Sequence, residues 1–334
     1  MSKKKNKRSG SLGKRLLALA ITLLCAFATY LSNGEAQPFE VHFLDVGQAD
    51  CALIIADGKT MLIDGGEIGA GPEIIDYLHT QGVHKLDVLV ATHPHSDHIG
   101  GLPYIVEHMA ISQTYISPYV HTSATYENLL DNLEKSDSIV TIPETGDTFR
   151  LGGANCQVLS GGHGFDDPND ASIVLRVTYG DVSALFTGDA EVPVEQQILA
   201  SGMEVRSNIL KVGHHGSETS SDQAFLDAVL PEIAVISCGI GNSYGHPHAV
   251  TLKKLTCEVL RTDVEGAIVL ASDGITVTRK GEIAPFKIYI GNWDSKVLHT
   301  VFCEYLPAFE NMDFFWNRSM ALDEGYTPCG SCKP

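Results

Sequence analysis

The chain has 334 residues, of which 44% are hydrophobic and 19% are charged. This composition is typical of a globular protein with a sizeable core, and the length fits one large domain or two unequal ones. The formal net charge of −18 excludes a broad basic surface for nucleic acid, so any such substrate must be held by a local site.

The segment of residues 1–36 is predicted to be a targeting segment. Lys and Arg residues between Lys3 and Arg15 precede an apolar run from Leu16 to Leu31. Positive charge before such a run keeps the N-terminus in the cytoplasm and directs the following chain outward. The run is long for a signal peptide and short for a spanning helix. A cleaved signal peptide and an uncleaved membrane anchor both stay open, and either one predicts an extracytoplasmic protein, secreted or anchored to the cytoplasmic membrane.

Short strand patterns alternate with helix patterns between residues 37 and 282. The continuous apolar run Leu86–Ala91 predicts a strand buried on both faces, and Gly180-Asp181 predicts a tight turn between strands Ser172–Tyr179 and Val182–Phe186. Because strands and helices are interspersed, the predicted class is α/β. The other predicted strands are Glu40–Val46, Cys51–Ala56, Thr60–Ile63, Asn208–Val212 and Ile233–Ser237, and the predicted helices are Pro72–Gln81, Glu191–Ala200 and Ser220–Val229.

The strongest chemical signal directly follows the buried strand, where the chain reads Thr92-His93-Pro94-His95-Ser96-Asp97-His98. His93 and His95 are two residues apart on a loop, so both side chains can reach one ion. Asp97 and His98 are adjacent and can turn toward a second ion nearby. Imidazole and carboxylate ligands suit Zn²⁺ and also accept Mn²⁺ or iron. Such a site lowers the pKa of bound water and supplies hydroxide at neutral pH, which favours a hydrolase.

This motif resembles the signature of the metallo-β-lactamase superfamily. Further matches lie before and after it, in a fixed order along the chain. They resemble the subgroup that includes the extracellular hydrolase domain of ComEC-type competence proteins, which take up DNA. The resemblance implies an αββα sandwich over residues 37–282 and a metal-dependent hydrolase, in particular a phosphodiesterase or nuclease. The other matching segments are Phe43–Gln48, Met61–Gly66, Asn169–Ser172, Leu185–Asp189, Val212–Ser217 and Tyr244–His248.

The resemblance also implies two neighbouring metal sites that share Asp189. Two Zn²⁺ or Mn²⁺ ions are the expected cofactors. One site would consist of His93, His95 and Asp189, and the other of Asp97, His98, Asp189 and His215. Of the two adjacent histidines, His215 is assigned to the metal and His214 to the substrate, with the reverse assignment as the alternative.

The first of these sites departs from the family pattern. Many members have a further histidine shortly before the strand that ends at Asp189, whereas this chain has Asn169 and Asp170, with His163 earlier. Oxygen ligands favour harder ions. A carboxylate or amide at this position would therefore weaken the site for Zn²⁺ and suit Mn²⁺ better.

Further side chains are candidates for roles around the metals. His214 and His248 are predicted to bind a substrate oxyanion or to protonate a leaving group, and with Asp97 they form the expected catalytic set. Asp64 closes an apolar strand, where it either orients a ligand histidine or caps a turn. Glu191 either lines the pocket or is a first-turn helix carboxylate favoured by the helix dipole.

Residues 283–334 are predicted to form a small unit of their own, which includes a strand at Lys287–Gly291. His299-x3-Cys303 and Cys329-x2-Cys332 have the spacing of a structural Zn²⁺ site, with a disulfide as the alternative outside the cytoplasm. The segment resembles the zinc domain of Ada-type DNA-repair regulators, which uses four cysteines, one of them a methyl acceptor. Since His299 stands at the first ligand position, the resemblance implies a structural or docking module rather than methyl transfer.

Two classes of function follow from these patterns. The first is an exported or membrane-anchored phosphodiesterase, in particular a nuclease acting on DNA. Hydrolases of phosphocholine esters, lactones or β-lactams share the same fold and are the alternatives within this class. The second is a non-catalytic docking protein with a degenerate metal site. The remaining residues of these types are predicted to be ordinary surface or core residues, namely His42, His79, His84, His108 and His121, with Cys51, Cys156, Cys238 and Cys257 as core thiols.

Overall fold

The computed structural model describes residues 38–280, 289–300, 303, 305–308, 311–315, 321–322 and 324–332. The predicted targeting segment, residues 1–36, lies outside these described residues. Within them, no helix combines the length and the apolar content needed to cross a membrane.

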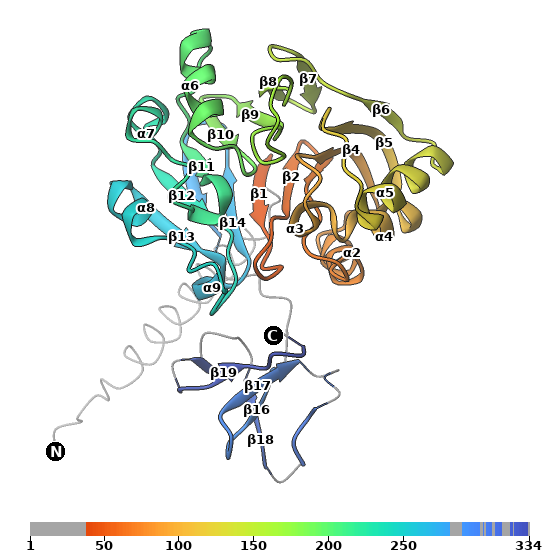
Figure 1. The fold of residues 1–334 in the computed structure, drawn as a ribbon, viewed down its shortest axis with the longest axis vertical. Helices are drawn as coiled ribbons and strands as arrows, with labels where there is room; N and C mark the ends of the chain where they lie inside the picture. Colours follow the sequence, from red (N-terminus) through yellow and green to blue (C-terminus); the bar gives the residue numbers. More distant parts are fainter. Residues whose placement is uncertain are drawn as a thin grey trace, which may run out of the picture. The chain divides into compact units, whose positions relative to one another are not determined.

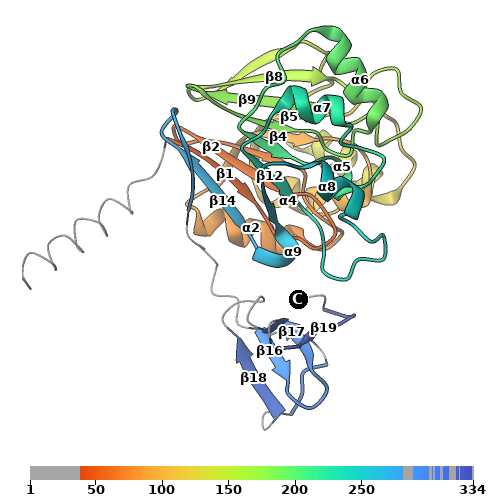
Figure 2. The same ribbon diagram turned by 90° about the vertical axis from the view of Figure 1, so that its left-hand side faces the viewer.

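Residues 38–280 form two β-sheets. The first has eight strands in the order β15-β14-β1-β2-β3-β4-β5-β6, and the second has seven in the order β13-β12-β11-β10-β9-β8-β7 (Figure 1). In the first sheet β1 pairs antiparallel with both β2 and β14, which lie on either side of it in Figure 2. The strands are β1 Phe39–Phe43, β2 Ala52–Ala56, β3 Lys59–Ile63, β4 Lys85–Ala91, β5 Ala110–Ile116, β6 Ile139–Thr141, β7 Thr148–Leu151, β8 Ala154–Ser160, β9 Val174–Tyr179, β10 Val182–Phe186, β11 Ile209–Lys211, β12 Ile233–Ile236, β13 Glu258–Arg261, β14 Ile268–Ser272 and β15 Val277–Arg279.

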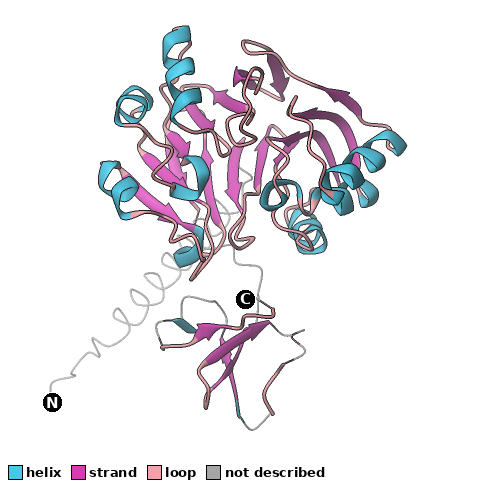
Figure 3. Cartoon of the chain, viewed as in Figure 1, coloured by secondary structure: helices cyan, strands magenta, loops and turns pink. Residues whose placement is uncertain are grey.

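Three apolar cores hold the sheets and helices together. Phe43, Val90 and Phe186 belong to the core between the two sheets. A second core joins the first sheet to α2, α4 and α5, and a third joins the second sheet to α6, α7 and α8. Helices therefore cover the outer faces of both sheets (Figure 3), which confirms the predicted αββα sandwich. The helices are α2 Gly71–Thr80, α3 Ser96–Ile99, α4 Leu102–His108, α5 Ala124–Lys135, α6 Val192–Ser201, α7 Gln223–Val229, α8 Ala249–Lys254 and α9 Thr262–Glu265.

The strands and helices predicted for this region are present, with bounds that differ by a few residues. The Gly180-Asp181 turn joins β9 to β10, where Tyr179 pairs with Val182. β4 is buried from Val88 to Ala91, as its apolar run predicts. The patterns missed several elements, including β5, β13 and β14. β5 mixes exposed and buried positions irregularly, so neither an apolar run nor a clean alternation marks it.

The C-terminal sheet is a four-stranded sheet in the order β18-β16-β17-β19. β16 covers part of the predicted strand Lys287–Gly291, whose first two residues lie outside the described ranges. The described core of this sheet is small and contains Tyr289, Leu298, Phe315, Ala321 and Tyr326. Its strands are β16 Tyr289–Asn292, β17 Val297–Thr300, β18 Met312–Phe315 and β19 Thr327–Pro328.

Candidate metal centre

The residues predicted to bind metal in the αββα region follow the ends of strands from both sheets. His93 follows β4 of the first sheet, whereas Asp189 follows β10 and His215 follows β11 of the second. β4 runs parallel to β3, and β10 runs parallel to β11. Loops at the carboxyl ends of parallel strands are where α/β proteins place ligand-binding side chains.

One predicted site is assembled in full. Asp97, His98, Asp189 and His215 each offer one ligand atom, and these atoms lie within 4.8 Å of one another. His215 Nε2 lies 3.2 Å from Asp97 Oδ2 and 3.5 Å from Asp189 Oδ2. His98 Nε2 lies 3.3 Å from Asp189 Oδ1. The structure thus brings together all four side chains that the sequence assigned to the second metal.

Two atoms at the centre of this group have unmet bonding capacity. His98 Nε2 and Asp189 Oδ1 are fully buried, and neither has a hydrogen-bond partner of suitable geometry among the described residues. Buried polar atoms are rarely left without a partner, because the lost hydration is costly. A cation between them would satisfy both atoms, so the donor set fits a divalent metal ion.

The charges around the group also favour a cation. Burial alone would lower the pKa of His98, but the carboxylates of Asp189 and Asp64 outweigh it and raise this pKa well above its usual value. The same balance, with Asp189 and Asp50 as the main carboxylates, raises the pKa of His215 to about 10. The site therefore has an excess of negative charge, which a divalent metal ion would neutralise.

His93 and His95 form the beginning of the other predicted site. His93 Nε2 lies 3.1 Å from His95 Nδ1, so both rings direct a nitrogen to one place. The opposite nitrogen of His93 lies 3.2 Å from Thr92 Oγ1 and 3.3 Å from Ser172 Oγ. Burial first, and then nearby His98, hold the pKa of His93 well below its usual value. A neutral ring with one free nitrogen is the form that binds a metal.

The structure does not place His163 beside this pair. His163 contacts Pro143 and Glu144 instead, with its side chain 41% exposed. Asp170 Oδ1 accepts a hydrogen bond from the backbone of Glu191 at 3.0 Å. The amide oxygen of Asn169 is buried and has no hydrogen-bond partner within the described part of the chain, so Asn169 stays the better candidate of the two for an oxygen ligand.

Asp64 orients His98. Its Oδ2 lies 2.8 Å from His98 Nδ1, which leaves Nε2 for the centre of the group. The carboxylate also accepts hydrogen bonds from Thr92 N and Thr92 Oγ1, both at 2.8 Å. Of the two roles that the sequence left open, the contacts favour orientation of the His98 ring over turn capping, and Asp64 also fixes the loop that follows β4.

Asp50 contacts the Nδ1 side of the His215 ring, and Lys211 in turn contacts Asp50. The sequence analysis missed both residues. Asp50 Oδ1 lies 3.3 Å from His215 Nδ1, which is also 2.9 Å from the carbonyl of Ser237. Lys211 is 4% exposed, and its Nζ lies 2.6 Å from Asp50 Oδ2. Burial would raise the pKa of Asp50, but Lys211 and then His215 outweigh it and hold the value at about 2. The visible signal was a lysine at the end of the apolar strand β11.

His214 is held by Glu191 at the edge of the group. The turn after β11 puts His214 and His215 at φ values of 47° and 53°, a region that costs energy for residues with a side chain. This turn directs the two adjacent rings differently. His214 Nδ1 lies 3.0 Å from Glu191 Oε1, and its Nε2 lies 3.7 Å from Asp189 Oδ2. Thr219 donates to the same Glu191 oxygen at 2.7 Å.

Three more histidine rings line the group. His248 Nδ1 accepts a hydrogen bond from the backbone of Glu218 at 2.9 Å, and its ring is 4.8 Å from that of His246. His246, to which the sequence gave no role, has its ring centre 5.6 Å from that of His214. His121, predicted to be isolated, has its ring 6.3 Å from that of His95. His121 stands in no metal-ligand spacing, whereas His246-Pro247-His248 repeats the spacing of His93-Pro94-His95, a signal that the sequence analysis did not use.

The other histidines and cysteines named in the sequence analysis lie either in the protein core, on the surface or in the C-terminal sheet. His42 is buried and bonds Tyr77 and Glu40, as a satisfied core histidine does. Cys51, Cys156 and Cys238 are buried free thiols as predicted, whereas Cys257 is only partly buried. His299, Cys303, Cys329 and Cys332 lie together in the C-terminal sheet. His79 and His84 lie near each other, and His108 stacks on Tyr104.

Comparison with known proteins agrees with this geometry. A family model described as Metallo-beta-lactamase superfamily matches residues 44–240. ComE operon protein 3 of Bacillus subtilis is 28% identical to this chain, and the match covers 77% of this chain. Competence protein ComA of Neisseria gonorrhoeae is 31% identical, and the match covers 85% of this chain. The chain spans only 36% and 39% of these two relatives.

The solved structures that are similar include the metallo-beta-lactamase fold protein YhfI from Bacillus subtilis. It has a TM-score of 0.47 and 11% identity, and the match covers 69% of this chain and 98% of that protein. The family model covers more than half of the described αββα region, including the residues from His93 to His215. The chain therefore belongs to the metallo-β-lactamase superfamily, related to competence proteins, and this membership supports a metal-dependent hydrolase.

Proposed function

We propose that the chain is an exported or membrane-anchored metal-dependent phosphodiesterase that cleaves DNA outside the cytoplasmic membrane. The observation that carries the hydrolase part is the group of Asp97, His98, Asp189 and His215, with its two buried unpartnered atoms. The relationship to competence proteins supports DNA as the substrate. The basic residues before the apolar run Leu16–Leu31 support export or anchoring.

The donor atoms assign two metal positions. His93 Nε2 and His95 Nδ1, with Asp189, would hold one Zn²⁺ or Mn²⁺, and Asn169 is the candidate for a further oxygen ligand. The group of Asp97, His98, Asp189 and His215 would hold the other. Bound divalent ions supply hydroxide at neutral pH and stabilise negative charge on a phosphoryl group.

The surrounding residues of the chain bind the substrate and move a proton. His214, oriented by Glu191 at 3.0 Å, is placed to protonate the leaving oxygen. His121 Nδ1 accepts a hydrogen bond from the backbone N–H of Ser123 at 3.2 Å. In the neutral ring its Nε2 therefore carries the proton and is free to donate to a phosphate oxygen. His246 and His248 extend the same face beyond His214.

The acidic character of the chain agrees with a substrate held at the metals. With a net charge of −18, the surface repels DNA except where positive charge is concentrated. We therefore expect DNA binding to require bound metal, and to be negligible for the metal-free chain at physiological salt.

The decisive experiment is a hydrolysis assay on the purified full-length chain in detergent. The substrates are a bis-aryl phosphodiester and single- and double-stranded DNA, each with Zn²⁺ or Mn²⁺. The Asp97→Asn variant should lose on the order of 10³-fold in rate, because metal-assisted hydrolysis accounts for several kcal/mol of barrier lowering. Asp87→Asn is the matched control. Asp87 lies near the start of β4, away from the metal ligands, and pairs with the exposed Lys59 of β3.

Each outcome decides between the functions that the sequence left open. Metal-dependent DNA cleavage that Asp97→Asn abolishes and Asp87→Asn retains supports the nuclease. A fully metallated chain that cleaves neither substrate would refute the phosphodiesterase and direct the search to other esters or lactones. A chain that binds no metal in the αββα region would favour the docking protein instead.

A further inference from the structure

The C-terminal sheet gathers four side chains that the proposed hydrolysis does not use. β17 and β19 run parallel, with Leu298 paired to Pro328. The next residues along the two strands are His299 and Cys329, so the pairing brings them to the same end of the sheet. Cys329 N donates to Leu298 O at 2.8 Å, which fixes this approach. Cys303 follows His299 by four residues, and Cys332 follows Cys329 by three.

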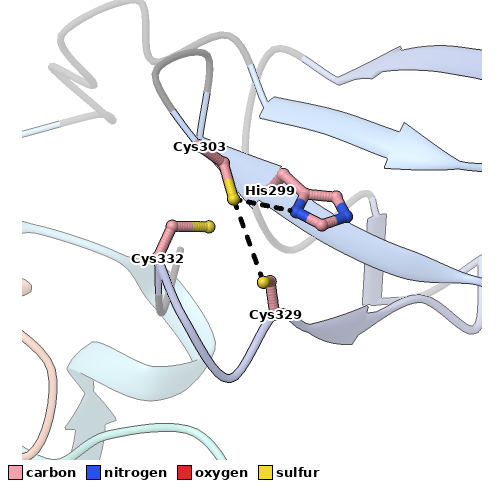
Figure 4. A group of neighbouring side chains, drawn as sticks. All are labelled: His299, Cys303, Cys329 and Cys332. Carbon is pink, nitrogen blue, oxygen red and sulfur yellow. Dashed lines mark hydrogen bonds between the residues drawn. The ribbon is translucent and has the colours of Figure 1, made fainter. Parts of the chain in front are cut away.

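The ligand atoms of these four side chains lie within 4.8 Å of one another. Figure 4 shows His299, Cys303, Cys329 and Cys332 directed toward a common centre. His299 Nδ1 lies 3.2 Å from Cys303 Sγ, and Cys303 Sγ lies 4.0 Å from Cys329 Sγ. Tetrahedral Zn²⁺ with Zn–S bonds of about 2.3 Å requires sulfurs roughly 3.8 Å apart, whereas a disulfide requires about 2.0 Å. The spacing fits the metal and not the disulfide.

The three sulfur atoms also accept backbone hydrogen bonds. Thr300 N donates to Cys332 Sγ, Tyr305 N to Cys303 Sγ and Ser331 N to Cys329 Sγ, each at 3.4 Å. Such bonds stabilise negative charge on sulfur, which is the form that binds a metal. His299, Cys303 and Cys329 are buried, at 4%, 7% and 8% exposure, so the group is shielded from solvent on most sides.

We propose that His299, Cys303, Cys329 and Cys332 bind one Zn²⁺ in a closed structural site on which the folding of the C-terminal sheet depends. Three thiolates and an imidazole are soft and borderline donors that select zinc over Mg²⁺ or Mn²⁺. Four protein ligands complete a tetrahedron, and no position is left for water or substrate. The core that the described residues form has five buried side chains, and a segment as short as this one generally needs a metal or a disulfide to stay folded.

A closed site assigns the cysteines a different role from that of a reactive thiol. Each of the three sulfurs accepts a hydrogen bond from a backbone N–H and would share its charge with the metal, which lowers its reactivity relative to that of a free thiolate. The Ada-like resemblance includes one cysteine that accepts a methyl group. The histidine at the first ligand position opposes methyl transfer here.

Cobalt substitution of the purified full-length chain tests the ligand set. Co²⁺ bound by thiolates gives an intense near-ultraviolet charge-transfer band, whereas the His and Asp donors of the αββα region cannot. We expect this band in the wild-type chain, its clear weakening in Cys303→Ser, which removes one of three thiolates, and its full retention in Cys257→Ser, which removes a partly buried cysteine outside the group. Absence of the band from the cobalt-loaded wild-type chain, or an equal band in Cys303→Ser, would overturn the proposal.

Alkylation followed by mass spectrometry keeps the proposal testable even where Cys303→Ser fails to fold. In the zinc-loaded wild-type chain we expect Cys303, Cys329 and Cys332 to resist iodoacetamide and to react together once a chelator is added. Rapid alkylation of one of them while the zinc stays bound would refute the closed site and favour a methyl-acceptor role. A disulfide found before any reduction would refute zinc binding. Neither readout depends on hydrolysis, so the outcome is independent of the proposed function.

Discussion

The two groups of metal-binding side chains differ in what supports them. The ligands of the αββα region follow strands that are held by large apolar cores, and Asp64 and Asp50 fix the rings of His98 and His215. The ligands of the C-terminal sheet rest on two short strands and, among the residues that the structure describes, on a core of five side chains. We therefore expect the αββα site to form without metal, and the C-terminal sheet to need metal in order to fold.

The largest expected effect is therefore the loss of structure when zinc is removed from the C-terminal sheet. The free energy of zinc binding to small thiolate sites is about 10 kcal/mol or more, which exceeds what the small core can supply. Both tryptophans of the chain, Trp293 and Trp316, belong to this segment. Chelation should thus change the tryptophan fluorescence strongly, while the circular dichroism of the αββα region stays close to that of the metal-loaded chain.

Experiment can contradict the expectation for either of the two regions. Unchanged tryptophan fluorescence after elemental analysis has shown complete zinc loss would mean that the C-terminal sheet folds without metal. Collapse of the αββα circular dichroism after chelation would mean that its metal site is not built in advance.

The second effect concerns Lys211, which compensates Asp50 behind the metal site. Lys211→Met leaves the buried Asp50 carboxylate without its cation at 2.6 Å, and breaking a buried ion pair costs about 3–5 kcal/mol. The double change Lys211→Met with Asp50→Asn removes both charges, so it should recover a large share of that loss. Denaturant unfolding followed by circular dichroism measures both variants, with Lys254→Met as the control for a partly exposed lysine. Equal losses in the single and double variants would contradict the pairing.

The same ion pair predicts a dependence on pH. Lys211 holds the pKa of Asp50 at about 2, below the value of about 3.9 of an unfolded aspartate. The stabilisation is fully present above about pH 4 and is lost as the pH falls toward 2, because the unfolded chain then binds more protons. The wild-type free energy of unfolding should fall over this range more steeply than that of the double variant. Parallel pH profiles would count against the role of Lys211.

A smaller effect is expected at Asp64, which orients His98 without binding metal itself. Asn in its place retains an oxygen for the hydrogen bond from Thr92 N but replaces the charged Oδ2 that faces His98 Nδ1 with an amide NH₂ group. Residues in this role typically change metal affinity by about 10- to 100-fold. Competition with a chromophoric chelator should show Asp64→Asn weaker by this factor and Asp87→Asn unchanged. An unaltered affinity of Asp64→Asn would make Asp64 a loop-fixing residue only.

The sequence predicted those parts of the molecule that a short segment encodes. His93, His95, Asp97 and His98 fall within six positions after a buried strand, so their spacing alone identified a metal site. The hairpin at Gly180-Asp181 and the helix Pro72–Gln81 have local turn and start signals in the same way. Asp189 and His215 lie far from this motif and were assigned only through the family resemblance.

The parts that the sequence did not reveal depend on contacts between distant segments. β14 pairs with β1 across more than two thirds of the chain, and no local period encodes such a pairing. Asp50 and Lys211 meet only because β11 and the loop after β1 approach the same histidine. His121 is a single histidine in a loop, where a role at the site and a place on the surface leave the same local pattern. His246 stands two residues before His248, but this spacing alone does not tell which of the two rings faces the site.

The smallest effect tests how Glu191 serves His214. Gln in place of Glu191 keeps the size of the side chain but weakens the charged contact to His214 Nδ1 at 3.0 Å. If His214 protonates the leaving oxygen, cleavage of DNA should slow by about tenfold, since general-acid catalysis as a whole accounts for about 10²- to 10⁴-fold. Cleavage of the bis-aryl phosphodiester should change little, because an aryl oxide leaves without protonation.

The ratio of the rate of DNA cleavage to the rate of bis-aryl phosphodiester cleavage therefore distinguishes loss of proton transfer from a structural change of the site. Glu232→Gln is the matched control, since Glu232 is exposed and its carboxylate contacts Asn208 rather than a histidine. A loss of equal size on both substrates would mean that Glu191 only stabilises the turn that holds the metal ligand His215. A selective loss on DNA would instead place His214 at the leaving group and make the two adjacent histidines functionally distinct, one binding metal and the other moving a proton.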